Sequence, residues 1–511
     1  MSTHSHPIQL HVNGERAAID DVGGSLLEAL RDQLGIRSPK DGCSPQGQCG
    51  CCTVLVDGQP RVSCVTPARR VAGRAVTTVD GLDDADDWAD AMCATGGSQC
   101  GFCTPGIIVR LSALRAKYGE LDEDRVTDAL KAHLCRCTGW QTIVEAAVDL
   151  PGMDPGRDLA AASQRATLEG RADQRVHPDV ALGAGGFADD AAPVGAAVAV
   201  RDQGGAWVRA ESVTAARQAA GKVQGRRTTR VSEPPIELPA GEWAITLRTS
   251  WVEPAYLETD ASWAVPGGEP TTPLANGGAF GAKLDTDVVH EARTQADAVG
   301  VPVRVLASRE DTVRHGPKRP PIAAGLDADG NGVVRVARTA GIADAIRRVA
   351  PGLVVEEVDV EGPSTSVAIR GAGWVEAAVL RAAASANATI TSPEGAVASA
   401  SYDGRTIDVE VRCGRVLDEV VLRSYCIGAA HMAYSWVTSE ALTVEDGEVL
   451  DLTVRSFGIV RAVDMPPVRV SIIEEEAEPV NGSDAAFAAV AAAVWRHHDH
   501  GEVWPVLVSG D

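Results

Sequence analysis

The first part of the chain carries the alternating apolar and polar positions of short strands, interrupted by one helical run. Residues 8–12 alternate in this way, and Asn13-Gly14 then predicts a tight hairpin turn into a return strand. Ser25 is placed to cap a helix, because the leucines of residues 26–34 recur on one helical face. A second alternating run covers residues 54–56. The pattern predicts a small mixed sheet that carries one helix.

Helical patterns follow this sheet. Pro105 suits the first turn of a helix whose apolar face runs through residues 107–114. A second helix is predicted over residues 124–134, and a third begins near Thr142. Farther along, strand-like runs alternate with alanine-rich helical runs. The clearest predicted strands are residues 194–200, 303–306 and 333–336, and the clearest predicted helices are residues 213–223, 375–385 and 485–494.

The length of 511 residues exceeds one ordinary hydrophobic core and predicts about three or four domains. Residues 151–190 are rich in proline, glycine, alanine and alternating charges, with little apolar periodicity, and we interpret them as a linker. They separate a sheet domain (1–80) and a helical domain (81–150) from a long α+β or α/β region (191–511). The fold class is therefore multidomain α+β.

Charge and hydropathy exclude several classes of protein. The formal net charge of −23 repels phosphate backbones and makes nucleic-acid binding a poor hypothesis. The longest apolar stretch, near residues 485–495, is far short of a bilayer span. The N-terminus is polar and lacks both an apolar signal core and twin arginines. We therefore expect a cytoplasmic protein without a membrane span.

The cysteines are concentrated near the N-terminus, where ten of the 12 lie before residue 138. Residues 42–53 form a glycine-studded loop with several of them, and Cys64 follows one strand later. Four thiolates here can hold two ferric ions and two sulfides, while loop glycines let backbone N–H groups point at sulfur. C-x-x-C with a further cysteine one strand later is the plant-ferredoxin arrangement. Buried spectator thiols explain one cysteine but not five in 22 residues, and zinc is the stronger rival.

A second cysteine group sits in helical sequence. Cys100 and Cys103 precede the helix that Pro105 opens, and Cys135 and Cys137 follow the next helix. Dipoles at helix N-termini would stabilise a negatively charged cluster between them. C-x-x-C alone would be a weak hint of a redox or zinc site, but C-x-x-C followed by C-x-C with 31 residues between them is a strong signal of a metal cluster.

Residues 7–150 resemble the iron–sulfur subunit of the molybdenum hydroxylases, the family of xanthine dehydrogenase, aldehyde oxidoreductase and carbon monoxide dehydrogenase. The resemblance is carried by LLEALRDQLG, CGCCTVLVDG, QCGFCTPG and LCRCTGW. It implies a β-grasp, ferredoxin-like domain followed by a helical-bundle [2Fe–2S] domain. It also implies that Gln99 lies against the pterin. The implied ligands of the first cluster are Cys43, Cys49, Cys52 and Cys64, and those of the second are Cys100, Cys103, Cys135 and Cys137.

Two features depart from that pattern. One extra residue lies between Cys43 and Cys49, and Cys51 stands where the family has alanine. We interpret the insertion as an outward bulge and Cys51 as a spectator, with a ligand exchange between Cys51 and Cys49 as the alternative. Cys93 has no partner at a useful spacing and is expected in a hydrophobic core.

The region beyond residue 190 resembles a shortened molybdopterin-binding subunit of the same family. The motif order matches at residues 253–259, 276–283, 302–311, 368–373 and 446–467. By this resemblance Gly277, Gly278 and Gly281 let backbone approach the cofactor, Phe280 flanks the substrate, Arg370 orients it and Glu478 is the general base. The region is less than half the usual length, and residues 473–477 replace the glycines expected before Glu478.

Three functions are consistent with these features. The first is an electron-transfer subunit that passes electrons from molybdopterin in a large partner subunit through two [2Fe–2S] clusters to a flavin or other acceptor subunit, with the C-terminal region as a docking scaffold. The second is a self-contained minimal molybdenum hydroxylase with molybdopterin in its own C-terminal region. The third is a non-catalytic assembly protein that binds iron or zinc. We favour the first, because the cluster motifs are intact and the molybdenum-site motifs are eroded.

Overall fold

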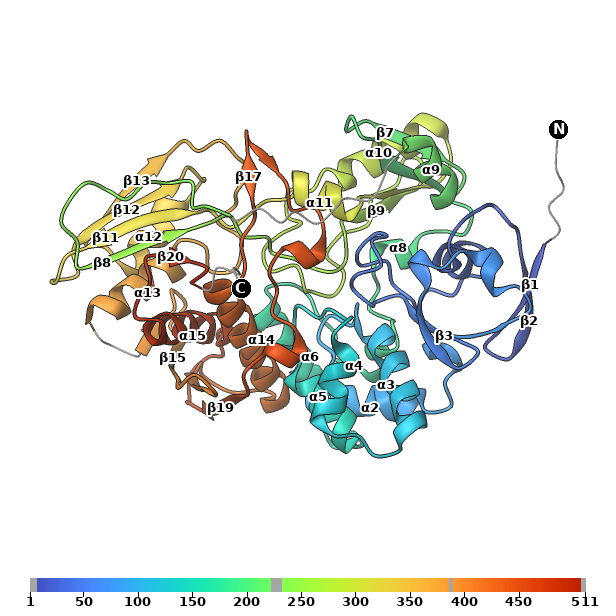
Figure 1. Cartoon of the computed structure of the whole chain (residues 1–511), viewed down its shortest axis with the longest axis horizontal. Helices are drawn as coiled ribbons and strands as arrows, with labels where there is room; N and C mark the ends of the chain where they lie inside the picture. The colour runs from blue at the N-terminus through green and yellow to red at the C-terminus, as the bar shows by residue number, and fades with distance from the viewer. Residues whose placement is uncertain (1–6, 222–231, 386–388, 507–511) are drawn as a thin grey trace.

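The computed structural model describes residues 7–221, 232–385 and 389–506. The molecule is elongated, with the cysteine-rich N-terminal part at one end and the C-terminal sheets and helices at the other (Figure 1). A small α/β unit lies beside the N-terminal sheet. The architecture is α+β in several units. Among the described residues, none of the helices is both long enough and apolar enough to cross a membrane.

The N-terminal sheet has the strand order β2-β1-β5-β3-β4. The predicted hairpin is confirmed, with Asn13 and Gly14 both at positive φ between β1 and β2. The predicted cap is also confirmed, because Ser25 and Glu28 hydrogen-bond each other's backbone N–H. The strands are β1 Ile8–Val12, β2 Glu15–Ile19, β3 Thr53–Val56, β4 Gln59–Val62 and β5 Ala75–Thr77, and the helix is α1 Leu26–Glu28, continued by the π-helical turn Ala29–Gln33.

Helices cover the next stretch of the chain, as predicted. They are α2 Ala85–Thr95, α3 Thr104–Tyr118, α4 Glu123–Leu130 and α5 Gln141–Asp149, and the short 3-10 turns Ser63–Val65, Ala68–Val71 and Val79–Gly81 precede them. Pro105 lies in the first turn of α3. The helix predicted to reach residue 134 ends earlier, because the Leu134 N–H donates to the Cys49 carbonyl at 2.9 Å instead of continuing the helix.

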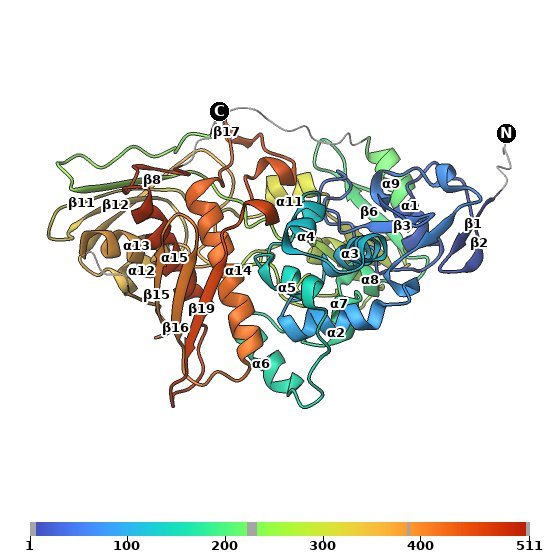
Figure 2. The same cartoon turned by 60° about the horizontal axis from the view of Figure 1, so that its bottom comes forward.

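The segment predicted as a linker, residues 151–190, contains helices α6 Leu159–Gly170, α7 Pro178–Ala181 and α8 Ala188–Ala191. Helix α6 lies beside α14, Glu419–Thr438 (Figure 2). Ala162 and Ala166 of α6 are buried against Val421 and Tyr425 of α14. The apolar face of α6 consists of small alanines, and a periodicity argument based on large apolar residues therefore missed it. This segment packs as part of the folded core.

A small α/β unit follows, with the strand order β7-β6-β10-β9. Its elements are β6 Ala197–Arg201, β7 Trp207–Ala210, α9 Val213–Ala220, β9 Ala261–Ala264, α10 Val288–Val299 and β10 Val303–Leu306, with α11 Arg309–His315 after them. The predicted strand at residues 303–306 is confirmed. The last two residues of the helix predicted at 213–223 lie outside the described residues.

The C-terminal part contains a five-stranded sheet ordered β13-β12-β11-β8-β20, a four-stranded sheet ordered β14-β15-β16-β19, and a short hairpin. Its strands are β8 Ile245–Thr249, β11 Ile322–Leu326, β12 Gly332–Ala337, β13 Leu353–Val358, β14 Thr389–Thr391, β15 Val397–Tyr402, β16 Ile407–Arg412, β17 Val444–Glu445, β18 Glu448–Val449, β19 Val468–Ile473 and β20 Val503–Trp504. Its helices are α12 Ile342–Val349, α13 Trp374–Ser385, α14 Glu419–Thr438 and α15 Ser483–His497, with 3-10 turns at Val454–Ser456 and Ala462–Asp464. Almost all of α15 is buried, and it packs against α13, α14 and β15.

Candidate functional site

The first group of thiols lies in the loop that leads into β3 and in the turn after β4. The four predicted ligands are at most 5 % exposed: Cys43, Cys49, Cys52 and Cys64. Backbone N–H groups of Gln46 and Gln48 point at the Cys43 sulfur, at 3.2 and 3.4 Å. Hydrogen bonds with the Cys49 and Cys64 thiols hold the pKa of Cys43 well below its ordinary value. This loop therefore stabilises a thiolate, which is the form that binds metal.

The second group of thiols lies where α3 begins and where the chain turns between α4 and α5. Cys103 is the N-cap residue of α3. The sulfurs of Cys100 and Cys137 are 3.6 Å apart. A hydrogen bond with the Cys103 thiol, supported by Thr138, lowers the pKa of Cys135 to about 7. The structure thus brings the four predicted cysteines of this group together as well.

The thiols of each group contact one another. In the first group Cys43 is linked by hydrogen bonds with both Cys49 and Cys64, and Cys64 is also linked with Cys52. In the second group hydrogen bonds link Cys100 with Cys137 and Cys103 with Cys135. Within the described residues, no three His, Cys, Asp or Glu side chains surround a common point that could hold a single metal ion. A [2Fe–2S] cluster takes two thiolates on each iron, so the chemistry of these donors, four in each group, fits two such clusters.

The loop that carries the first group is packed directly against the second group. A Cβ atom on Gly106, in the first turn of α3, would lie 2.7 Å from the Cys51 carbonyl oxygen. Cys51 itself is fully buried beside Cys49, and electrostatic interactions reach it from Cys52 in one group and Cys135 in the other. The two thiol groups are therefore neighbours, with Cys51 between them.

A different set of predicted residues lines a small cavity against the second thiol group. Gln99, Gly278, Phe280, Gly281 and Arg370 all contribute to its wall, together with Cys100 and Cys137. The Gln99 amide donates to the Ser424 hydroxyl at 2.9 Å. Gly278 has a φ of 77°, and a Cβ atom there would lie 2.9 Å from the Cys100 Cβ, so only glycine fits beside this thiol. Gly277, the remaining predicted glycine, is next to Gln174.

Glu478 does not belong to this set. Its side chain is 88 % exposed, and it pairs with Arg415 at 3.2 Å on the surface. Arg370, in contrast, is buried and held by Asp484 at 2.8 Å and by the Ser483 hydroxyl at 2.6 Å. The structure therefore brings together the predicted residues other than Gly277 and the predicted general base Glu478.

The cavity is too small for molybdopterin. Its volume is about 30 Å³, whereas pockets that hold ligands of that class measure roughly 300–1,000 Å³. The surrounding space is filled by side chains of α6 and of the residues that follow it, among them Glu169 and Arg171. The residues around this cavity therefore do not fit the cofactor.

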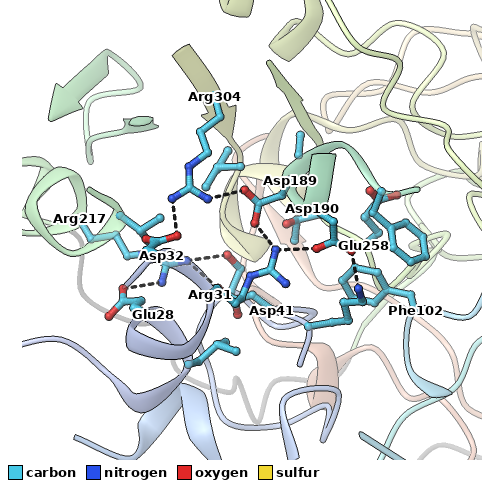
Figure 3. A pocket seen from close by; sticks show the side chains of 18 residues that line it. Glu28, Arg31, Asp32, Asp41, Phe102, Asp189, Asp190, Arg217, Glu258 and Arg304 are labelled. Atoms are coloured by element: carbon cyan, nitrogen blue, oxygen red, sulfur yellow. Dashed lines mark hydrogen bonds and ion pairs between the residues drawn. The ribbon is translucent and has the colours of Figure 1, made fainter. Parts of the chain in front are cut away.

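Charged residues that the sequence did not single out hold the N-terminal sheet to the small α/β unit (Figure 3). Arg31 pairs with Asp189 at 2.7 Å, and Arg304 pairs with both Asp189 and Asp32. Burial alone would raise the pKa of Asp189. The guanidinium groups of Arg304 and Arg31 nevertheless hold this pKa well below its usual range. Arg217 pairs with Asp41 at 2.8 Å beside the first thiol loop. In the sequence these charges resemble ordinary surface residues.

Comparison with known proteins places the N-terminal third among iron–sulfur proteins. Residues 78–148 match the family described as [2Fe-2S] binding domain. The nicotine 6-hydroxylase small subunit of Paenarthrobacter nicotinovorans is 38% identical over 148 residues, which are 28% of this chain and 89% of that subunit. The aldehyde oxidoreductase of Megalodesulfovibrio gigas is 38% identical over 159 residues, which are 29% of this chain but span only 17% of that protein's length.

The remainder of the chain is similar to a solved structure at the level of fold. The aldehyde oxidoreductase of Desulfovibrio desulfuricans superposes with a TM-score of 0.71 at 14% sequence identity, and the alignment covers 96% of this chain and 97% of that one. The likeness therefore extends beyond the cysteine-rich third into the C-terminal sheets and helices.

Proposed function

Because this chain belongs to the molybdenum hydroxylase family, we propose that it is the electron-transfer subunit of such an enzyme complex. It relays electrons from molybdopterin in a large partner subunit to a flavin or other acceptor subunit. Two [2Fe–2S] clusters carry them, the first held by Cys43, Cys49, Cys52 and Cys64 and the second by Cys100, Cys103, Cys135 and Cys137.

The gathering of eight buried thiols in two neighbouring groups of four is the observation that carries this proposal. When bound, each cluster supplies a site that accepts and releases one electron at a time. The chain's own residues stabilise the thiolates through backbone N–H groups at Cys43 and through the Thr138 hydroxyl at Cys135. Close packing of Gly106 on the Cys51 carbonyl keeps the two groups adjacent, as a relay requires.

The surroundings of the two thiol groups differ, which supports electron entry at one group and exit at the other. Val65 follows Cys64 directly and is 50 % exposed, so the first group lies next to solvent, where an acceptor could approach. The second group is covered by the C-terminal region. The small cavity between them is lined by Phe280 and by the half-exposed Arg171. On this proposal the C-terminal region is the docking scaffold for the molybdopterin subunit.

A self-contained hydroxylase receives less support. The cavity of about 30 Å³ beside Cys100 has no space for molybdopterin, and the predicted general base Glu478 is on the surface. No observation favours this second candidate over electron transfer.

Metal analysis and electron paramagnetic resonance of the full chain after anaerobic reconstitution test the proposal. We expect about four iron and four acid-labile sulfide per chain, little molybdenum, and two distinct signals after reduction. Cys64→Ala should abolish one signal and Cys103→Ala the other. Cys93→Ala is the matched control, because this buried thiol contacts Arg157 and lies outside both groups. Stoichiometric molybdenum with substrate oxidation would point to a self-contained hydroxylase, and zinc in place of iron to an assembly protein.

A further inference from the structure

Two helix ends meet beside the small cavity, the C-terminal end of α6 and the N-terminal end of α15. The Asn481 side-chain amide joins them by donating to the carbonyl oxygens of Leu168 and Glu169, at 3.0 and 2.9 Å. The C-terminal end of a helix carries partial negative charge and the N-terminal end partial positive charge, so the two ends attract each other. The end of α6, in the segment that the sequence predicts to be a linker, thus packs against the start of the buried helix α15.

The Glu169 carboxylate occupies the anion-binding position of α15. One of its oxygens accepts the Gly482 N–H at 3.0 Å, and the other accepts the Ser483 N–H at 2.8 Å. Arg165, one turn earlier in α6, donates to the same carboxylate at 2.5 Å. Both charged side chains are completely buried. Backbone N–H groups at a helix start, together with a guanidinium, are the partners that a bound phosphate or sulfate commonly finds.

The charges around the site are balanced only as long as this carboxylate is present. Buried Arg165 and Arg370 face buried Glu169 and Asp484, and the half-exposed Arg171 pairs with both Asp484 and Glu394. Without Glu169 the site would hold excess positive charge and free N–H donors. In the part of the chain that the structure describes, the Nε and Nη1 atoms of Arg165 are already buried without a hydrogen-bond partner. This guanidinium therefore has further donors to offer a larger anion.

We propose that this is an oxyanion-binding site which the chain fills with its own Glu169 carboxylate. The carboxylate acts as an internal substitute for a tetrahedral oxyanion and keeps the site closed to phosphate-bearing ligands. Glu169 also lines the cavity of about 30 Å³, so removing its carboxylate and methylene group joins the two spaces and makes room for inorganic phosphate. The inference does not rest on electron transfer by the thiol groups.

Calorimetric titration of the full chain with inorganic phosphate, against chloride at matched ionic strength, tests this site. Glu169→Ala should bind phosphate about tenfold or more tightly than the unsubstituted chain. Glu169→Gln is the matched control, because the amide fills the same space and should exclude the anion. A folded Glu169→Ala protein that does not bind phosphate, or an unsubstituted chain that binds it equally well, would overturn the proposal.

Glu169→Ala leaves Arg165 buried without its carboxylate, so the variant is prepared in phosphate and, in parallel, in chloride. We expect a higher yield of folded protein and a higher melting temperature in phosphate, because a ligand that binds only the folded state stabilises it. Aggregation in both buffers would also overturn the proposal, since the oxyanion should replace the lost charge. Retention of both iron–sulfur signals in a variant that fails to bind phosphate would leave the proposed electron transfer standing while removing this inference.

Discussion

Arg136 and Glu440 form a bidentate ion pair, with N–O distances of 2.5 and 2.7 Å and both side chains at most 3 % exposed. Arg136 stands between Cys135 and Cys137, whereas Glu440 follows the end of α14 in the C-terminal region. The guanidinium also donates to the Pro254 carbonyl at 3.1 Å. Buried Arg136 thus links the second thiol group to the C-terminal region that covers this group.

Removing the carboxylate from this pair should destabilise the fold and disturb the second thiol group. Glu440→Gln leaves Arg136 buried without its counter-charge, and we expect a loss of about 3–5 kcal/mol in the free energy of unfolding. Glu448→Gln is the control, because that residue pairs with Arg314 on the surface and should cost less than about 1 kcal/mol. Denaturant titration measures both losses. Equal losses in the two variants would show that the buried pair contributes no more to the free energy of unfolding than a surface pair does.

The fifth thiol of the first group provides a second prediction. If Cys51 is a spectator, Cys51→Ala should leave both iron–sulfur signals intact in electron paramagnetic resonance, because the four predicted ligands keep their contacts with one another. Cys52→Ala should abolish the ferredoxin-like signal, since Cys52 is paired with Cys64. Loss of a signal in Cys51→Ala would instead assign Cys51 as a ligand in exchange with Cys49, which it contacts.

Local patterns in the sequence predicted those parts of the structure that depend on neighbours along the chain. The Ser25 cap, the Pro105 helix start and the cysteine spacings are of this kind, because a cap or a ligand loop is specified within a few residues. The same is true of α15, whose long apolar run indicates burial on all sides. The resemblance also placed Gln99 against the pterin and Arg370 beside the substrate, and both line one cavity.

The missed features depend on distant partners. Arg165 and Glu169 look like an ordinary exposed i,i+4 pair, and only the packing of α6 against α15 buries them. Asp189 and Arg31 lie far apart in the chain and meet at an interface that no local pattern indicates. Glu478 was selected for the residues around it, but the acidic run before it is solvated and the side chain stays outside the cavity.

The backbone of Gly278 lies so close to the Cys100 thiol that a side chain at this position should disturb the second thiol group. Gly278→Ala places a methyl group 3.0 Å from the Cys100 sulfur in a backbone conformation with positive φ, and it should perturb the second iron–sulfur signal while sparing the first. Gly267→Ala is the matched control, because its φ of 69° imposes similar strain but its Cβ would meet nothing within 4 Å. The strain alone should cost about 1–2 kcal/mol in either variant. An unchanged second signal in Gly278→Ala would contradict the placement of this loop.

Acid should destabilise the chain through His431, a fully buried residue of α14 whose Nε2 lies 2.9 Å from the Val460 carbonyl oxygen. Burial, reinforced by Arg136, lowers the pKa of His431 to about 4 from an ordinary value of 6.5. The folded chain therefore binds fewer protons than the unfolded chain between these pH values, and the free energy of unfolding falls as the pH falls through that window.

Denaturant titrations at pH 7 and pH 5 measure this effect. His431 should account for a loss of about 2 kcal/mol between them. His431→Gln should remove most of that loss, since its amide can still donate to the carbonyl of Val460 without titrating. His290→Gln is the control, because His290 is exposed on α10. The thiol groups are the same in all three proteins, so the differences in pH dependence between the proteins report on His431. The same pH dependence in His431→Gln as in the unsubstituted chain would show that this histidine is not held neutral by its burial.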